Sequence, residues 1–248
     1  MTGLIMTFGL GIFILIGAMI VFLTNNNAKF IDFSLSLALG VILMIMLTDL
    51  IPESYEIFTM KNIIWLILFV VLGFFLLYIL DRFIPNHEDD PTTNKDDHNH
   101  LVHIGLVSSI ALVLHNIIEG MAIYSTVLSS FSLGMMVSIG VGLHNIPLGM
   151  VIASSIYQHN QKKGKTLWLV LLLSLSTFLG GIILFLLGGN AINEFLLGIL
   201  LAITLGMLCY ISFCELLPHV LHSKYQKQSR LGIVCGIGLM MITVLLKQ

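Results

Sequence analysis

Charged residues are scarce in this sequence: Asp, Glu, Lys and Arg make up 10% of its 248 residues, whereas 57% are hydrophobic. A soluble domain carries about 25% charged residues, so this composition excludes a soluble protein. The mean hydropathy of +1.02 indicates an integral membrane protein instead. The formal net charge of −2 argues against nucleic acid as a partner, because nucleic-acid-binding surfaces are basic.

Cysteine is nearly absent too. The three cysteines form no CxxC motif, so neither a disulfide framework nor a redox motif is expected. Basic residues are missing from the start of the chain, where Lys29 is the first, although a signal peptide would begin with them. The first apolar run, about residues 4–23, is long enough to cross a bilayer, which takes about 20 residues, and we expect it to be retained as a helix.

Long apolar runs occupy most of the rest. Only helices and closed barrels satisfy their backbone groups inside a bilayer, and unbroken apolar runs of spanning length are typical of helices. The sequence thus predicts an all-α integral membrane protein with eight transmembrane helices in a single domain, residues 1–248. The expected spans lie at about 3–23, 31–52, 62–81, 101–128, 132–157, 166–188, 194–221 and 230–246.

Lysine and arginine are unequally divided between the loops of the two membrane sides. With eight spans, nine basic residues fall on one side, and only Lys61 and Lys247 fall on the other. Positive charge in short loops marks the cytoplasmic side. We therefore expect a multi-pass cell-membrane protein with both termini outside and the loop at about 82–100 in the cytoplasm.

That loop is the one long polar stretch of the chain. It holds His87, His98 and His100 among five acidic residues. One interpretation is a solvated, disordered linker, and another is a His/Asp-rich tract that captures metal weakly. The two roles are compatible, so both are kept.

Two related motifs lie in the middle of the fourth and fifth spans: HNIIEG at 115–120 and HNIPLG at 144–149. His115 and Glu119 are four residues apart and therefore face the same side of a helix. Ionisable residues at membrane depth are costly and mark functional sites, and imidazole with carboxylate suits Zn²⁺, Fe²⁺ or Mn²⁺. The final glycine of each motif is expected to let the two central helices approach each other. The candidate metal-site residues are His115, Asn116, Glu119, His144 and Asn145.

An internal repeat surrounds these motifs. The second span ends with DLIPE and the seventh with ELLPH, and a shift of 166 residues aligns Asp49 with Glu215 and Glu53 with His219. The two spans run in opposite directions, which is the signature of an inverted repeat of spans one to three and six to eight around spans four and five. Each mouth of a central path would then carry a metal-binding pair; ordinary helix-end residues are the other interpretation.

These motifs, HNIIEG, HNIPLG, DLIPES at 49–54 and ELLPH at 215–219, resemble those of the ZIP (Zrt/Irt-like protein) family of divalent metal transporters. The resemblance covers essentially the whole chain, and the family pattern in spans four and five is close to HNxPEG in both. It implies eight helices in a three-two-three arrangement with an inverted repeat. It also implies uptake of zinc, or sometimes iron, manganese or cadmium, into the cytoplasm.

The sequence departs from that family at three positions. Ile118 stands where proline is usual, Leu148 stands where the family usually has a glutamate, and Thr177 is the nearest equivalent of a glutamate on span six. In the family these two carboxylates help to build a second, adjacent metal position. We therefore expect one central ion here, in a site that keeps a net positive charge when it is loaded.

The resulting hypothesis is a transporter for a divalent cation, Zn²⁺ first. The ion would enter past Asp49 and Glu53, bind at the centre and leave past Glu215 and His219; a carrier is favoured by the repeat, and a channel through the same residues stays open. The alternatives are an intramembrane zinc hydrolase with a metal-bound water, or a metal sensor without transport. We expect no enzyme and no cofactor, with the metal ion and the lipid bilayer as partners and a homodimer left open.

Overall fold

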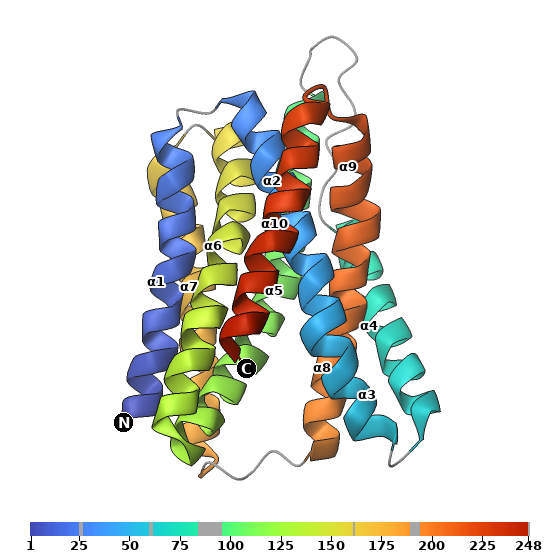
Figure 1. Cartoon of the computed structure of the whole chain (residues 1–248). Coiled ribbons are helices and arrows are strands. Elements are labelled where there is room, and N and C mark those ends of the chain that lie inside the picture. The colour runs from blue at the N-terminus through green and yellow to red at the C-terminus, as the bar shows by residue number, and fades with distance from the viewer. Residues whose placement is uncertain (25–26, 60–61, 84–95, 161, 189–193, 248) are drawn as a thin grey trace.

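The structure, a computed structural model, describes residues 1–24, 27–59, 62–83, 96–160, 162–188 and 194–247. Within these ranges the chain is a bundle of helices without a strand (Figure 1). Eight of the described helices are long and apolar enough to cross a membrane, so the predicted all-α membrane fold is confirmed. The helices are α1 (Thr2–Leu23), α2 (Ala28–Ile45), α3 (Ile51–Thr59), α4 (Ile63–Phe83), α5 (Asp96–Ser129), α6 (Phe131–Asn160), α7 (Lys163–Leu186), α8 (Glu194–Tyr210), α9 (Leu217–His222) and α10 (Gln226–Lys247).

The second and seventh spans are each interrupted by a π-helical turn, η1 (Met46–Leu50) between α2 and α3, and η2 (Ile211–Leu216) between α8 and α9. The Ile51 N–H donates to the Met46 carbonyl, and the Leu217 N–H donates to the Ser212 carbonyl. These two bonds are related by the same shift of 166 residues. The residue after each of these donors is a proline, Pro52 or Pro218. A proline has no N–H and its ring clashes with the carbonyl four residues earlier, so the hydrogen bonds there join residues five apart, as in a π-helix.

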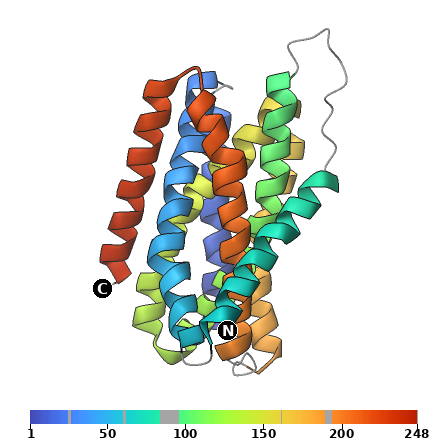
Figure 2. The same ribbon diagram turned by 90° about the vertical axis from the view of Figure 1, so that its right-hand side faces the viewer.

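The packing of the helices follows the repeat as well. Helix α2 packs against α10 while α8 packs against α4, and α1 packs against α6 while α5 packs against α7. The repeat relates α1 to α7, α2 to α8, α4 to α10 and α5 to α6. Under this exchange the contact between α2 and α10 becomes that between α8 and α4, and the contact between α1 and α6 becomes that between α7 and α5. Helix α2 descends and α8 ascends in Figure 1, and Figure 2 shows α10, α2, α8 and α4 in succession across one face. This arrangement agrees with the predicted three-two-three inverted repeat.

Glycines set the closest approaches between helices. A Cβ on Gly120 of α5 would lie 1.9 Å from the Thr177 carbonyl oxygen of α7, and a Cβ on Gly149 of α6 would lie 2.1 Å from the Ile14 carbonyl oxygen of α1. The expectation that these two glycines join the central helices to each other is therefore wrong. They allow α5 to pack closely against α7 and α6 to pack closely against α1. The sides of α5 and α6 that face each other can then carry larger polar side chains.

Candidate metal centre

Three ionisable side chains converge between the two central helices. His115 and Glu119 of α5 and His144 of α6 each offer a ligand atom, and these atoms all lie within 4.8 Å of one another. Glu119 Oε1 lies 2.9 Å from His144 Nε2 and 3.7 Å from His115 Nε2. The two histidines are 6% and 1% exposed. In the part of the chain that the structure describes, this is the only such group of three His, Cys, Asp or Glu residues.

The helix geometry explains why these residues meet. His115 and Glu119 are one helical turn apart on α5, so both point to the same side. Helix α6 follows after Ser130 and packs along α5, which brings His144 to the carboxylate from the opposite side. Two imidazole nitrogens and a carboxylate oxygen form a donor set that suits Zn²⁺, with a fourth position left for another ligand or water.

The two asparagines of the motifs have different surroundings. Asn145 donates its Nδ2 to Glu119 Oε2 at 3.3 Å, so this amide orients the carboxylate. Neither amide atom of Asn116 has a hydrogen-bond partner among the described residues, and the same holds for Asn145 Oδ1 and His144 Nδ1. Leaving a buried polar group unpaired costs about 1–3 kcal/mol. A water molecule brought to these atoms, or a cation brought to the two amide oxygens, would therefore relieve an existing penalty.

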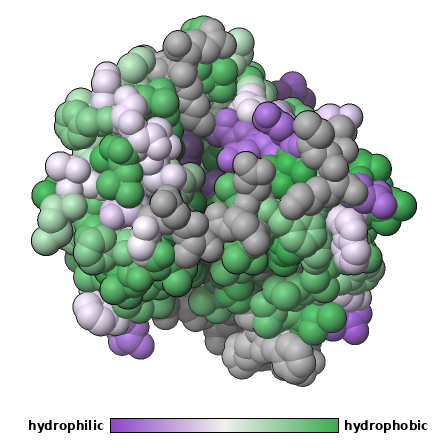
Figure 3. Space-filling model, turned by 90° about the horizontal axis from the view of Figure 1, so that it is seen from below, coloured by the Kyte–Doolittle hydropathy of each residue, from purple (hydrophilic) through white to green (hydrophobic). Residues whose placement is uncertain are grey.

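A cavity of about 440 Å³ connects this centre to one end of the bundle. Its lining includes His115 and Glu119 at the inner end and Asp49, Glu53 and Glu56 of the second span. Seen from that end, a hollow bordered by hydrophilic residues opens between hydrophobic surfaces (Figure 3). The structure therefore places the predicted pair Asp49 and Glu53 in the same cavity as the centre. Glu56 was missed, although its spacing of three from Glu53 continues the same helical stripe.

The second predicted pair lies toward the opposite end of the bundle and does not line this cavity. Glu215 is in η2 and 6% exposed. The His219 ring, on α9, lies 3.3 Å from Asp32 Oδ1 of α2, and Ser223 donates to the other oxygen of the same carboxylate. Sequence reasoning missed Asp32, yet an acidic residue near the start of the apolar second span, in addition to Asp49 near its end, was a signal that could have found it.

The departures from the family pattern are buried. Leu148 of α6 is 1% and Thr177 of α7 is 0% exposed, so both side chains lie in the interior of the bundle. In the loop, His87 lies outside the described residues, and the side chains of His98 and His100 are not described either. Metal capture by the loop remains a prediction.

Comparison with known proteins gives a consistent assignment. The family model described as "ZIP Zinc transporter" matches residues 2–103 and 97–243. A protein named zinc transporter ZupT from Oceanobacillus iheyensis is 32% identical over 93% of this chain and 92% of its own length. The zinc transporters ZupT of Streptococcus mutans and Chlorobaculum parvum are also 32% identical, over 99% and 93% of this chain and 97% and 92% of their own lengths. The chain belongs to the ZIP zinc transporter family.

Proposed function

We propose that this chain carries Zn²⁺ across the cell membrane, with the ion held by His115, Glu119 and His144. The observation that supports this most directly is the cluster of three ligands, two of which, His115 and Glu119, line a cavity that also holds three further carboxylates. Family membership makes the chain a transporter rather than an enzyme, so the intramembrane hydrolase is set aside. Zn²⁺ is then the transported substrate and not a cofactor.

The cavity supports an ordered path for the ion. A hydrated cation is drawn in by Asp49, Glu53 and Glu56, because carboxylates in a cleft with low-dielectric walls concentrate positive charge. At the centre it takes the place between Glu119 and the two histidines and loses water. The inverted repeats then rearrange around the central helices, and the ion leaves past Glu215 and His219, as alternating access in repeat-built transporters requires.

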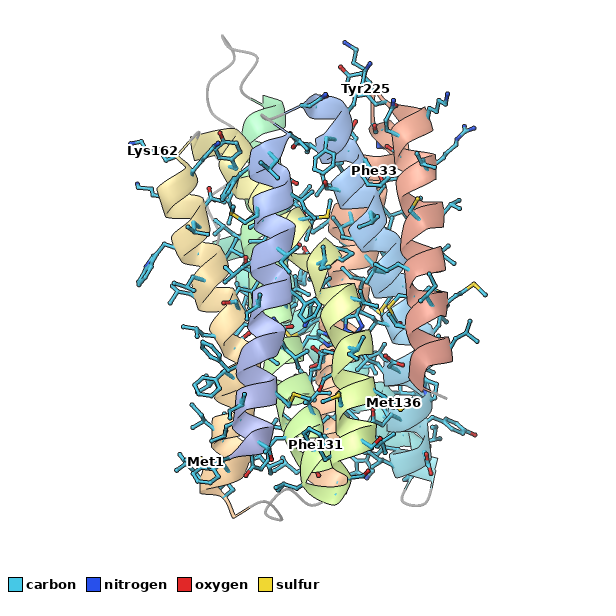
Figure 4. The ribbon with its side chains drawn as sticks, turned by 60° about the vertical axis from the view of Figure 1, so that its left-hand side comes forward. Met1, Phe33, Phe131, Met136, Lys162 and Tyr225 are labelled. Atoms are coloured by element: carbon cyan, nitrogen blue, oxygen red, sulfur yellow. The ribbon has the colours of Figure 1, made fainter. Side chains whose placement is uncertain are left out.

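The orientation of the chain in the membrane follows from charge. Lys162 and Tyr225 mark one end of the bundle, and Met1 and Phe131 mark the other (Figure 4). The end with Lys162 carries most of the basic residues, which assigns it to the cytoplasm. With this orientation the cavity opens to the outside and both termini lie outside. The loop at 82–100 is then cytoplasmic, and the chain forms a single transmembrane domain. An ion that enters this cavity from outside and leaves at the cytoplasmic end is imported, and import is the direction that we propose.

Uptake into proteoliposomes tests the proposal. Vesicles that contain the purified protein are expected to accumulate Zn²⁺ in a saturable manner, and His115→Ala is expected to stop it. Fe²⁺, Mn²⁺ and Cd²⁺ measured in parallel rank the substrates. Binding of all four metals without uptake of any would contradict transport and would return the sensor hypothesis.

A first prediction concerns the outer carboxylates. We expect Asp49→Asn to raise the KM for Zn²⁺ by about threefold to tenfold with little change in the maximal rate, because it weakens attraction toward the cavity and not binding at the centre. The effect should shrink at high ionic strength, since salt screens exposed charges. Uptake kinetics at two salt concentrations measure it. An equal loss of maximal rate at both would mean that Asp49 acts in a later step.

A second prediction concerns Leu148, one turn beyond His144 on α6. With Glu119 as the one carboxylate of the central group, the loaded site keeps a positive charge, which Leu148→Glu would neutralise. We expect this variant to lower the KM for Zn²⁺ by about tenfold and to slow turnover, because release becomes harder. Leu148→Gln, of similar shape and without charge, is the matched control and should not lower the KM.

A further inference from the structure

An imidazole and a carboxylate, both side chains of types that bind metals, meet toward the end of the bundle opposite the cavity. Asp32 of α2 and His219 of α9 approach to 3.3 Å between Oδ1 and Nε2, and their side chains are 13% and 17% exposed. The pair lies near the end marked by Phe33 and Tyr225 in Figure 4. It joins two helices that are far apart in sequence, so it exists only because the second and seventh spans pack together.

The carboxylate of this pair is held in position. Ser223 donates its hydroxyl to Asp32 Oδ2 at 2.5 Å, and the Tyr225 N–H donates to Ser223 Oγ at 3.0 Å. The Gln226 side chain donates to carbonyls at the end of α9 and in the turn after it, including that of Ser223 at 2.9 Å. The turn between α9 and α10 therefore fixes the oxygen atoms of Asp32 beside the imidazole, which lowers the cost of organising a binding site there.

The repeat gives this pair a place on the ion's route. The shift of 166 residues relates His219 to Glu53 and Glu215 to Asp49, and the outer pair lines the cavity that leads to the centre. By this relation, Glu215 and His219 hold the positions at the opposite end of the bundle that correspond to Asp49 and Glu53. Asp32 has no acidic counterpart on the outer side, where the shift leads to Gly198. The carboxylate of Asp32 is therefore an additional possible ligand beside His219, one that the corresponding outer position lacks.

We propose that Asp32 and His219, with the Ser223 hydroxyl, form a second divalent-cation site, the last one that Zn²⁺ occupies before it enters the cytoplasm. This inference rests on the proposed direction of transport. Imidazole nitrogen and carboxylate oxygen suit the same ion as the centre. The centre offers two imidazoles and a carboxylate, whereas this site offers one imidazole and one carboxylate, and water would complete its coordination shell. The site therefore binds Zn²⁺ more weakly than the centre and releases it more readily. Binding strength then falls along the route, which favours release.

Protection of a cysteine from alkylation tests the site independently of transport. Asp32→Cys keeps a zinc ligand at this position, because a thiolate coordinates Zn²⁺. We expect Zn²⁺ at ten times the site's dissociation constant to slow maleimide labelling of this cysteine by about tenfold. Lys29→Cys, exposed one turn earlier on α2, is the matched control and should be labelled equally fast with and without Zn²⁺. The background replaces the native thiols Cys209, Cys214 and Cys235 with alanine.

Two double variants decide the outcome. In Asp32→Cys/His219→Gln the protection should be lost, and its persistence, or equal protection of Lys29→Cys, would overturn the site. In Asp32→Cys/His115→Ala the protection should remain although uptake stops. Protection without uptake by the wild-type protein would refute the proposed transport and leave the site standing. Uptake that depends on His115, without protection at position 32, would refute the site alone.

Discussion

Glu119→Gln is expected to reduce Zn²⁺ uptake to about one hundredth of the wild-type rate or less. Glu119 is the one carboxylate in the central group and contacts both histidines. Removing one partner of a buried charge pair costs about 3–5 kcal/mol, and a divalent ion placed there would meet only neutral ligands. A glutamine has the same shape and still offers an oxygen to the Asn145 amide, so the loss comes from the charge and not from misfolding.

Glu56→Gln is the matched control. Glu56 lines the same cavity but is not part of the central group, so its amide variant should keep most of the maximal uptake rate, with at most the rise in KM expected for Asp49→Asn. Both variants would be compared by initial uptake rates in proteoliposomes and by Zn²⁺ binding in detergent, after their monodispersity has been checked. If Glu119→Gln kept more than a tenth of the wild-type rate, the ion would have to be held elsewhere than between His115 and His144.

Gly120→Ala is expected to destabilise the fold strongly, although it adds a single methyl group. Its Cβ would lie 1.9 Å from the Thr177 carbonyl oxygen, so α5 and α7 must move apart. Overpacking of this kind costs about 1–3 kcal/mol, and a shift of several degrees in the thermal unfolding midpoint follows for a chain of this size. Because His115 and Glu119 are on the same helix, we also expect weaker Zn²⁺ binding.

Gly9→Ala provides the comparison, since a Cβ at Gly9 of α1 meets no atom within 4 Å. It should leave the unfolding midpoint unchanged or raise it slightly, because alanine favours helix over glycine by about 0.8–1 kcal/mol. Thermal unfolding of both variants in the same detergent, with zinc uptake measured alongside, decides the prediction. Equal midpoints would mean that the contact between α5 and α7 is not tight in the membrane.

The parts of the fold that depend on local spacing were predictable. Scarcity of charge and runs of about 20 apolar residues predicted the eight spans, and the interval of four between His115 and Glu119 predicted their common direction. The convergence of His144 with them followed from the repeated motif. The shift of 166 residues predicted that the second and seventh spans are equivalent, and the π-helical turns at corresponding places agree with it.

Features that depend on which helix faces which were not predictable in the same way. Asp32 and His219 are 187 residues apart, and no local pattern shows that α2 and α9 meet. The predicted packing partners of Gly120 and Gly149 were wrong for a similar reason, because a glycine permits close packing without determining which helix packs against it. Glu56, by contrast, was within reach, since it continues the stripe of Asp49 and Glu53.

In the proposed transport cycle, the single carboxylate at the centre makes both halves depend on the membrane potential. With Zn²⁺ bound the central group carries one positive charge, and with the site empty and Glu119 ionised it carries one negative charge. A membrane potential of 100 mV is worth about 2.3 kcal/mol for each elementary charge that crosses it. An interior-negative potential therefore favours the state in which the loaded centre opens to the inside and the state in which the empty centre opens to the outside, so that in the proposed cycle the voltage across the membrane contributes to both steps.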